Sequence, residues 1–419
     1  MPKRTIPFLI VIGLLGLPWS FTINILDPFI YTEKVNLLAP LNLKNTVLGF
    51  ITIMGLIVAL IVQPIMGRIS DRTRSPWGKR IPYLAIGVIG ICCCLVFIVA
   101  AESLGLLIMA VMLASAFANT MQGPWQALIP DRVPEEQRGL ATGIKTLLEL
   151  TGAVAGLVVI ERTLSRRDLW TAPWIALTLF VVFLLATLYT LNQSSGKNEP
   201  VTSNEARPHF SWSALKLSQA PALPWWMLNR FLFWSSAIAL RTFMLNYVQD
   251  VHGLSLAEAE ALGSRVLLVL GAGVFLLALP AGVMADRIGR RPLLIIAGFL
   301  AAGGAAFFVF LRDLNMIFVA GGLIALGGGI FVSVSWAFAT DLAPKTEGAL
   351  YLGLANAATV VGSIGGRLGG PLIDGLNQVT NTLTIGYWVV FAIAALFFAG
   401  SSLAVLKIPE YRTSARNDL

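Results

Sequence analysis

Residues 67 to 72 read Gly67-Arg68-Ile69-Ser70-Asp71-Arg72 and are followed shortly by Gly78-Lys79-Arg80. The same basic motif returns as Gly282-Val283-Met284-Ala285-Asp286-Arg287, followed by Gly289-Arg290-Arg291. The two aspartates are 215 residues apart, and the same offset relates two Trp-Ser pairs, Trp19-Ser20 and Trp234-Ser235. A shared offset of about half the chain indicates an internal duplication. Both copies lie between long apolar stretches, and parallel repeats of membrane helices are typical of transporters.

The composition is that of an integral membrane protein. Hydrophobic residues make up 56% of the 419 residues, charged residues only 12%, and the mean hydropathy is +0.78. An average soluble domain has about twice that charged fraction. The pI of about 9.6 is compatible with a nucleic-acid partner, but most basic residues lie in short segments beside apolar stretches, where membrane orientation explains them. We therefore expect no nucleic-acid partner.

Twelve apolar stretches reach the roughly 20 residues that a membrane-spanning helix needs. These stretches are continuous, whereas a membrane β-barrel would show alternating segments of about ten residues. The sequence therefore predicts an all-α integral membrane protein with twelve transmembrane helices. The predicted spans are 6–31, 46–69, 81–101, 104–129, 139–160, 171–191, 224–249, 259–284, 292–311, 314–339, 349–373 and 383–406.

Lysine and arginine are distributed unequally between the two sides of these spans. With the motif-bearing side taken as inside, that side holds 19 of these residues and the other side holds 6. The positive-inside rule then predicts that both termini are cytoplasmic, and we expect the protein in the cell (inner) membrane. The N-terminal apolar run resembles a signal peptide, but it continues to about Tyr31 without a small-residue cleavage site. We expect it to be retained as the first helix.

A polar stretch divides the predicted spans into two sets of six. Residues 192–222 are rich in Ser, Asn, Glu and Pro and are expected to form a cytoplasmic linker. The predicted domains are an N-terminal six-helix bundle (1–191), the linker, a C-terminal six-helix bundle (223–407) and a cytoplasmic tail (408–419). Inside the linker, the segment that contains Phe210, Trp212, Leu215, Lys216 and Leu217 is either a short interfacial helix or disordered.

The repeated motif resembles the signature of the major facilitator superfamily, which lies between helices two and three of each half. This resemblance covers the whole chain and implies two pseudo-symmetric six-helix halves. Gln63-Pro64, Asn119-Thr120-Met121-Gln122-Gly123-Pro124 and Leu352-Gly353-Leu354-Ala355-Asn356 are also similar to the sucrose-proton symporters, near the glycoside-pentoside-hexuronide cation symporters. Those sucrose symporters carry a proton-binding aspartate on helix four, where this chain has Ser115. Proton coupling by that residue is therefore excluded.

Polar residues form a stripe on predicted helix four. Ser115, Asn119, Gln122 and Gln126 follow the i, i+4, i+7, i+11 pattern of one helix face. A stripe that faced lipid would be unfavourable, so it either lines a cavity or forms hydrogen bonds between helices. We interpret it as a cavity wall. Trp125 on the same helix either stacks against a sugar ring or simply packs.

Two ionisable residues share one face of predicted helix five. Glu149 lies ten residues inside the span, about 15 Å from its start and close to the bilayer midplane, and Lys145 lies one turn away. They form either a structural ion pair or a coupling carboxylate whose protonation responds to Lys145 and to substrate. Asp27, with Asn24 and Ser20, forms a second polar stripe on helix one. Asp27 is either a further proton-coupling residue or a residue at headgroup level.

Three arginines fall in the outer parts of the C-terminal spans: Arg241, Arg265 and Arg367. They either attract an anionic substrate, because guanidinium groups bind carboxylate or phosphate bidentately, or extend to the lipid headgroups. Arg241 is expected to pair with Asp27 in one gating state. The predicted substrate-binding residues are Asn24, Asn119, Gln122, Trp125, Arg241, Trp336 and Asn356, and the predicted proton-coupling residues are Glu149, Lys145 and Asp27.

The basic motifs themselves are expected to form a cytoplasmic gate. The resemblance implies that the motif aspartates meet a helix N-terminus and that Arg72 and Arg287 pair with carboxylates, for which Asp131, Asp341 and Glu135 are candidates. The predicted gate residues are Gly67, Asp71, Arg72, Arg80, Asp131, Asp286, Arg287 and Arg291.

Together these observations predict a secondary active transporter that moves a small polar solute, a sugar or glycoside, by alternating access with protons as the coupling ion. One alternative is an organic-anion or sugar-acid carrier that uses the intramembrane arginines. Another is a membrane sensor that binds without transport. The sequence contains no Walker-type loop, nucleophile-base set or metal-ligand spacing, so we expect no enzymatic activity, no cofactor and no metal. The expected partners are a small-molecule substrate, protons and membrane lipids, with the protein acting as a monomer.

Overall fold

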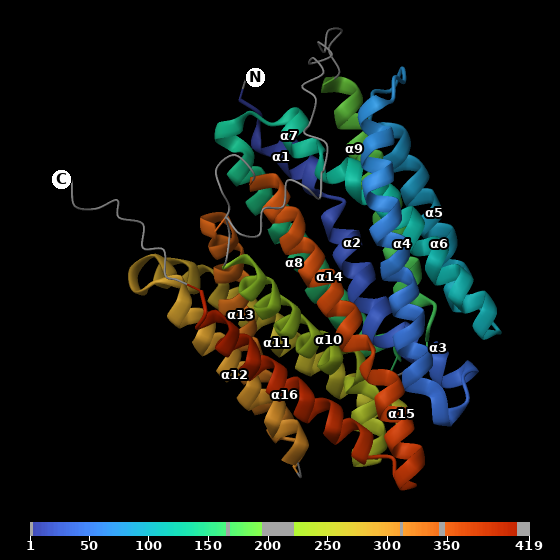
Figure 1. Cartoon of the computed structure of the whole chain (residues 1–419). Coiled ribbons are helices and arrows are strands. Elements are labelled where there is room, and N and C mark those ends of the chain that lie inside the picture. The colour runs from blue at the N-terminus through green and yellow to red at the C-terminus, as the bar shows by residue number, and fades with distance from the viewer. Residues whose placement is uncertain (1–2, 165–167, 195–221, 311–312, 343–347, 409–419) are drawn as a thin grey trace. The chain divides into compact units, whose positions relative to one another are not determined.

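The computed structural model describes residues 3–164, 168–194, 222–310, 313–342 and 348–408, apart from some side chains inside helices. Within these ranges the regular elements are helices, and no strand occurs among them (Figure 1). The predicted all-α fold is thus confirmed. Nine of the helices so described are long and apolar enough to cross a membrane, so the figure of twelve crossings stays a prediction.

The chain forms two compact units. The first comprises residues 1–204 together with 254–264, and the second comprises residues 205–253 together with 265–419. The predicted linker helix, with Phe210, Trp212, Leu215, Lys216 and Leu217, lies outside the described residues. The predicted domain boundaries therefore stay predictions.

The first unit is built from long helices that follow the predicted spans closely. Its elements are α1 (Ile6–Gly13), α2 (Gly16–Ile25), η1 (Leu26–Ile30), α3 (Tyr31–Leu38), η2 (Leu41–Leu43), α4 (Lys44–Arg72), α5 (Ile81–Ala100), α6 (Leu104–Gln126), α7 (Leu128–Arg132), η3 (Glu135–Gln137), α8 (Arg138–Leu164) and α9 (Thr171–Ser194).

The first predicted span departs from the expected single helix over 6–31. It extends to Leu38 and is interrupted twice, between α1 and α2 and again at η1, a five-residue π-helix. Pro28 explains the second interruption, because its ring nitrogen cannot donate the regular helical hydrogen bond. Asp27, predicted as a coupling residue, therefore lies in a π-helical turn, an irregularity that is frequent at functional sites.

Glycines bring α2 into close contact with α8. A methyl group at Gly152 would lie 2.0 Å from the carbonyl oxygen of Leu17, and one at Gly156 would lie 2.9 Å from that of Phe21. Two helices can approach this closely only where a side chain is missing, which is the small-residue packing typical of membrane interfaces. These contacts fix the height of the first helix against α8.

The second unit repeats this arrangement with its own helices. They are α10 (Leu223–His252), α11 (Leu256–Ile288), whose first turns belong to the first unit, α12 (Arg290–Phe310), α13 (Met316–Leu342), α14 (Gly348–Arg367), α15 (Gly369–Thr380) and α16 (Ile385–Val405). The predicted span 349–373 is divided at Leu368 between α14 and α15. Gly362 meets the carbonyl oxygen of Phe231 on α10, and Gly366 meets that of Ser235, at 2.8 and 2.3 Å from the added methyl group.

Candidate functional site

A tryptophan, a lysine and a carboxylate meet inside the first unit. The ammonium group of Lys145 lies 3.2 Å from Oε1 of Glu149, one helical turn further along α8. The same nitrogen lies over the ring of Trp125, 4.7 Å from its centroid, which is a cation–π contact. Trp125 comes from α6 and is only 2% exposed, and its indole nitrogen donates a 2.8 Å hydrogen bond to the carbonyl oxygen of Ile12. The cluster thus joins α1, α6 and α8.

A glycine makes room for this cluster. A methyl group at Gly16 would lie 2.9 Å from Cγ of Glu149 and 3.1 Å from Cη2 of Trp125. Gly16 begins α2, directly after the interruption of the first helix, so the break and the missing side chain together let the helix approach both residues. About 29% of the Glu149 side chain and 18% of the Lys145 side chain remain exposed, so the protein does not fully enclose the ion pair.

The predicted stripe on α6 is divided between local and interhelical contacts. Ser115 donates a 2.5 Å hydrogen bond to the carbonyl oxygen of Gly55 on α4, so its hydroxyl joins two helices. Asn119, 5% exposed, donates to the carbonyl oxygen of Ser115 on its own helix. Gln122 is half-buried and Gln126 is exposed. For Ser115 the structure favours the hydrogen-bonding alternative over a cavity wall.

Asn24 and Asp27 lie further along the first helix. Asn24 donates a 2.8 Å hydrogen bond to the carbonyl oxygen of Ser20, one turn earlier, and both predicted residues are half-buried. Asn24 thus lies in α2 and Asp27 in η1, whereas the Lys145–Glu149 pair lies on α8.

The first basic motif forms a charged network within the first unit. Arg80, which directly precedes α5 and is 6% exposed, contacts Oδ1 of Asp71 at 2.5 Å and Oδ2 of Asp131 at 2.9 Å. Its third contact is with the hydroxyl of Ser70. Lys79 adds a contact to Asp131 at 3.1 Å. Arg80 thus holds the carboxylates together, whereas Arg72, which the resemblance assigned to that pairing, is exposed at the end of α4.

The second motif shares the turn of the first but has other contacts. Gly78 and Gly289 both have positive φ angles, 93° and 95°, so each copy makes its turn at the same glycine. Arg291 donates a 2.7 Å hydrogen bond to the carbonyl oxygen of Leu406, and Arg287 is exposed. The side chains of Asp286, Asp341 and Glu135 lie outside the described residues.

The predicted arginines of the second unit have different surroundings. Arg367 is 6% exposed and donates to the carbonyl oxygen of Ser363, Arg241 is half-buried, and Arg265 is exposed. The side chains of Trp336 and Asn356 lie outside the described residues. Arg230 on α10 was not predicted as a site residue; it is 1% exposed and forms hydrogen bonds with hydroxyl groups of α13 and α14. Its position inside a predicted span was the available signal.

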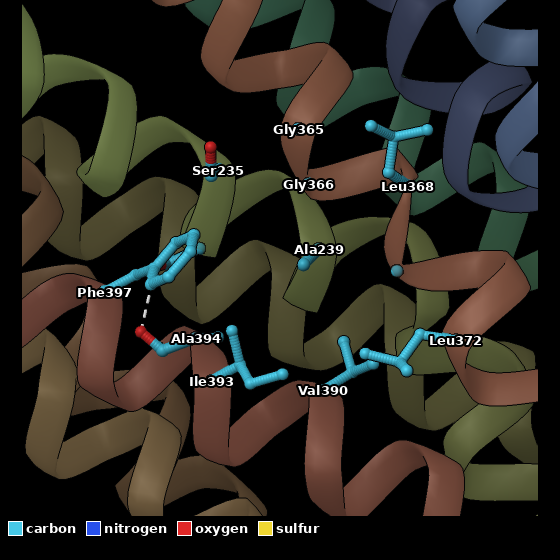
Figure 2. Close-up of a pocket in the computed structure, with 12 residues that line it drawn as sticks. Ser235, Ala239, Gly365, Gly366, Leu368, Leu372, Val390, Ile393, Ala394 and Phe397 are labelled. Atoms are coloured by element: carbon cyan, nitrogen blue, oxygen red, sulfur yellow. Dashed lines mark hydrogen bonds between the residues drawn. The ribbon is translucent and has the colours of Figure 1, made fainter. Parts of the chain in front are cut away.

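A pocket of about 170 Å³ lies between α10, α14, α15 and α16 of the second unit (Figure 2). Its walls are mainly apolar and include Leu372, Val390, Ile393 and Phe397, together with glycines of α14 and α15. Both serines that line it donate to backbone carbonyl oxygens: Ser235 to Gly362, and Ser236 to Leu232 and Ala394. A pocket with these walls does not suit a polar solute, and none of the predicted site residues lines it.

Comparison with known proteins supports transport. The sequence matches the family model described as Major Facilitator Superfamily over residues 8–276 and 258–418. It is 27% identical to the sucrose transport protein SUT1 of rice (Oryza sativa subsp. japonica) over 148 residues, which cover 30% of this chain and 26% of that protein. The match thus spans only about a quarter of the plant protein. An uncharacterized MFS-type transporter of Bacillus subtilis (strain 168), YuxJ, is 24% identical, with 85% of this chain and 86% of that protein covered.

Solved structures show the same fold. The nucleoside transporter NupG matches with a TM-score of 0.71 at 15% identity, over 96% of this chain and 98% of that chain. A D-xylose-proton symporter matches with a TM-score of 0.70 at 15% identity, over 96% of this chain and 97% of that chain. At these identities the likeness concerns the fold alone.

Proposed function

Because this chain belongs to the major facilitator superfamily, we propose that it carries a sugar or glycoside across the membrane by proton-coupled alternating access. Its activity is transport rather than catalysis, and its substrate is a small molecule. The observation that carries the finer proposal is the cluster of Trp125, Lys145 and Glu149. The partial matches to plant sucrose transport proteins support the same substrate class.

The cluster has the groups that a sugar needs. The face of an indole ring accepts the apolar face of a pyranose, and a carboxylate and an ammonium group accept and donate hydrogen bonds to its hydroxyl groups. In the structure Lys145 covers the ring of Trp125 at 4.7 Å, so the sugar would displace the ammonium group from the ring. Substrate binding and the Lys145–Glu149 ion pair are thereby linked.

This linkage supplies a route for proton coupling. Protonation of Glu149 removes the negative charge that holds Lys145 at 3.2 Å, so a proton and a substrate would each weaken the same ion pair. Binding of one would then favour binding of the other, which is the reciprocity that a symporter requires. Asp27, in the π-helical turn of the first helix, is the second proposed coupling residue.

The remaining assignments complete the proposal. The protein would cross the cell (inner) membrane twelve times as a monomer, with two pseudo-symmetric six-helix halves and cytoplasmic termini, in contact with membrane lipids. The Asp71–Arg80–Asp131 network would form the cytoplasmic gate, because its three residues tie together the ends of α4, α5 and α7. Breaking and forming such a network is a common switching device.

Uptake by proteoliposomes tests this function. Purified protein is reconstituted into vesicles whose interior is more alkaline than the medium, and accumulation of radiolabelled sucrose, methyl α-D-glucopyranoside and D-glucuronate is measured. We expect a neutral sugar to accumulate with the proton gradient, and Glu149→Gln to reduce gradient-driven accumulation by about tenfold or more. Glu102→Gln, a change at an exposed carboxylate before α6, is the control. Binding without accumulation would indicate a sensor instead.

An organic-anion or sugar-acid carrier is the second candidate. This candidate is favoured by Arg367, a charged residue in a predicted span whose side chain is only 6% exposed. A buried guanidinium group can bind a carboxylate bidentately. Accumulation of D-glucuronate without that of the neutral sugars would select this candidate, and Arg367→Gln should then abolish it.

A further inference from the structure

Arg230 is held deep inside the second unit. It lies seven residues after the start of α10, about 10 Å along the helix, and is 1% exposed. Its Nη1 donates a 2.9 Å hydrogen bond to the hydroxyl of Ser335 on α13. Its Nη2 and Nε donate to the hydroxyl of Thr359 on α14 at 2.7 and 3.2 Å. The guanidinium group therefore joins three helices through two hydroxyl groups.

A tryptophan lies against this arginine. Cζ of Arg230 lies over the ring of Trp226, 5.2 Å from its centroid, one turn earlier on α10. Trp226 is 1% exposed, and among the described residues its indole nitrogen has no hydrogen-bond partner. Buried indole N–H groups usually find a partner, so this donor is an exception that calls for an acceptor. The cluster combines an aromatic face with a directed set of donors.

The internal repeat relates this cluster to the site of the first unit. Gly152 packs on Leu17 in the first unit, as described above. Gly362 packs on Phe231 in the second, so α8 and α14 correspond at an offset of 210 residues. The helices they meet correspond at 214 by these contacts, one residue less than the offset of the Trp-Ser pairs. Gly156 with Phe21, and Gly366 with Ser235, give the same two offsets.

These offsets relate two residues of one cluster to two of the other. Arg230 corresponds to Gly16, and Thr359 corresponds to Glu149. In the first unit the glycine leaves space that the tryptophan and the carboxylate fill, and in the second unit the arginine reaches across to two small hydroxyl residues. The two units thus carry a charged group at corresponding places: Glu149 on α8 in the first unit and Arg230 on α10 in the second.

We propose that Arg230 is a substrate-binding residue that donates hydrogen bonds to adjacent ring hydroxyl groups of the sugar. The hydroxyl groups of Ser335 and Thr359 occupy those donors until the substrate's own hydroxyl groups replace them, while Trp226 lies beneath. This inference rests on the proposed function and deepens it. It assigns recognition of neutral hydroxyl groups to the second unit, because two hydroxyl oxygens already accept hydrogen bonds from the guanidinium group.

A purely structural role for Arg230 makes different predictions. An arginine that only joins α10, α13 and α14 would contribute to stability without affecting which hydroxyl groups a substrate needs. The distinguishing measurement is therefore the effect of deleting single substrate hydroxyl groups, in the native protein and in the variant.

The experiment uses methyl α-D-glucopyranoside and its 2-, 3-, 4- and 6-deoxy analogues. Binding to the purified full-length chain is measured by thermal shift, and transport by competition in proteoliposomes. We expect at least one deoxy analogue to bind the native protein about tenfold more weakly than the parent sugar, as for a hydrogen bond to a charged group. In Arg230→Lys that discrimination should fall to about twofold. Arg230→Gln provides the same comparison if the lysine variant does not fold.

A matched control lies next to Arg230 on α10. Asn229 is fully buried and donates a 2.9 Å hydrogen bond to the carbonyl oxygen of Ser401 on α16, so Asn229→Ala should lower stability and leave the discrimination intact. Equal discrimination in the native protein and in both Arg230 variants would overturn this inference while leaving the sugar proposal standing. Failure of the native protein to bind any of the five sugars would overturn the glycoside proposal and this inference with it.

Discussion

Arg80 and Asp131 are joined by a 2.9 Å contact from Nε to Oδ2, which links the start of α5 to α7. The same guanidinium contacts Asp71 at 2.5 Å, so one buried cation serves two carboxylates. Removal of the Arg80 guanidinium takes this cation away from both carboxylates. Arg80→Gln should therefore reduce the free energy of unfolding by about 1–3 kcal/mol. This range lies below that of fully buried pairs because the carboxylate side chains are 21% and 38% exposed. Thermal unfolding in detergent measures it.

Lys79 provides the control for this prediction. It contacts the same oxygen of Asp131 at 3.1 Å, but its side chain is 40% exposed. Exposed ion pairs contribute about 0–1 kcal/mol, so Lys79→Gln should change the melting temperature little. Equal losses in the two variants would contradict a special role for Arg80.

Gly16→Ala should impair substrate binding with little loss of fold. The added methyl group would meet Cγ of Glu149 at 2.9 Å and the edge of the Trp125 ring at 3.1 Å. Both atoms belong to side chains that can shift, so the cluster would move apart rather than the helix. We expect KM for the transported sugar to rise about fivefold to tenfold, measured by uptake in proteoliposomes. Gly143→Ala on α8, where a methyl group meets no atom within 4 Å, is the control.

Alanine at a close glycine contact of each unit should destabilise that unit. A methyl group at Gly152 would lie 2.0 Å from the carbonyl oxygen of Leu17, and one at Gly366 would lie 2.3 Å from that of Ser235. Backbone cannot give way as a side chain does, so each change should reduce stability by about 2 kcal/mol or more. Gly67→Ala, with no atom within 4 Å, should not do so. Unchanged melting temperatures for Gly152→Ala and Gly366→Ala would refute this view of the packing.

Asp168 gives a prediction about pH. It precedes α9 and accepts hydrogen bonds from the backbone of Trp170 and Thr171 and from the Thr171 hydroxyl, which hold the pKa of its carboxyl below the usual value. Because the folded pKa is lowered, this stabilisation is present above the unfolded pKa, near 4, and is lost as pH falls through the folded pKa. Asp168→Ala should cost about 1 kcal/mol at pH 7 and less below pH 4. A pH series of melting temperatures for the native protein and for Asp168→Ala tests this.

The hydrophobic pattern predicted most helix positions because apolar runs have few alternatives in a membrane. The span predicted over 81–101, for example, is α5 (Ile81–Ala100). The interruptions were not predicted. The break before Gly16 lies one turn before Pro18, whose ring nitrogen cannot donate a helical hydrogen bond to the carbonyl oxygen of Leu14, and the π-helical turn at Leu26–Ile30 contains Pro28. Neither leaves a mark in hydropathy.

In the candidate site, contacts within one helix were predictable from the sequence, whereas contacts between helices were not. The Lys145–Glu149 contact follows from a spacing of four residues on one helix and was predicted from it. The contact of Lys145 with Trp125 joins two helices, and spacing along the chain says nothing about it. Arg230 shows the limit most clearly, because its partners lie 105 and 129 residues away in sequence. Only the three-dimensional arrangement gives this arginine a role.

The turn glycines of the repeated motif allow a test of backbone conformation by itself. Gly78 has a φ of 93° and Gly289 a φ of 95°, whereas Gly67 lies inside α4. Methyl groups at Gly78 and Gly67 would meet no atom within 4 Å, so crowding plays no part in that comparison. Alanine is strained at positive φ by about 1–2 kcal/mol but favoured over glycine inside a helix by about 0.5–1 kcal/mol. Gly78→Ala should therefore lower the melting temperature and Gly67→Ala should raise it.

The same strain should reach the gate, because Gly78 lies between Asp71 and Arg80 in sequence and sets the turn that lets them pair. Gly78→Ala and Arg80→Gln are both expected to slow sugar uptake, and the double variant should be hardly slower than Arg80→Gln alone, since both changes act on one network. Gly289→Ala should show the same loss of stability in the second copy of the motif. Additive effects of Gly78→Ala and Arg80→Gln on uptake would show that the turn acts independently of the Arg80 network.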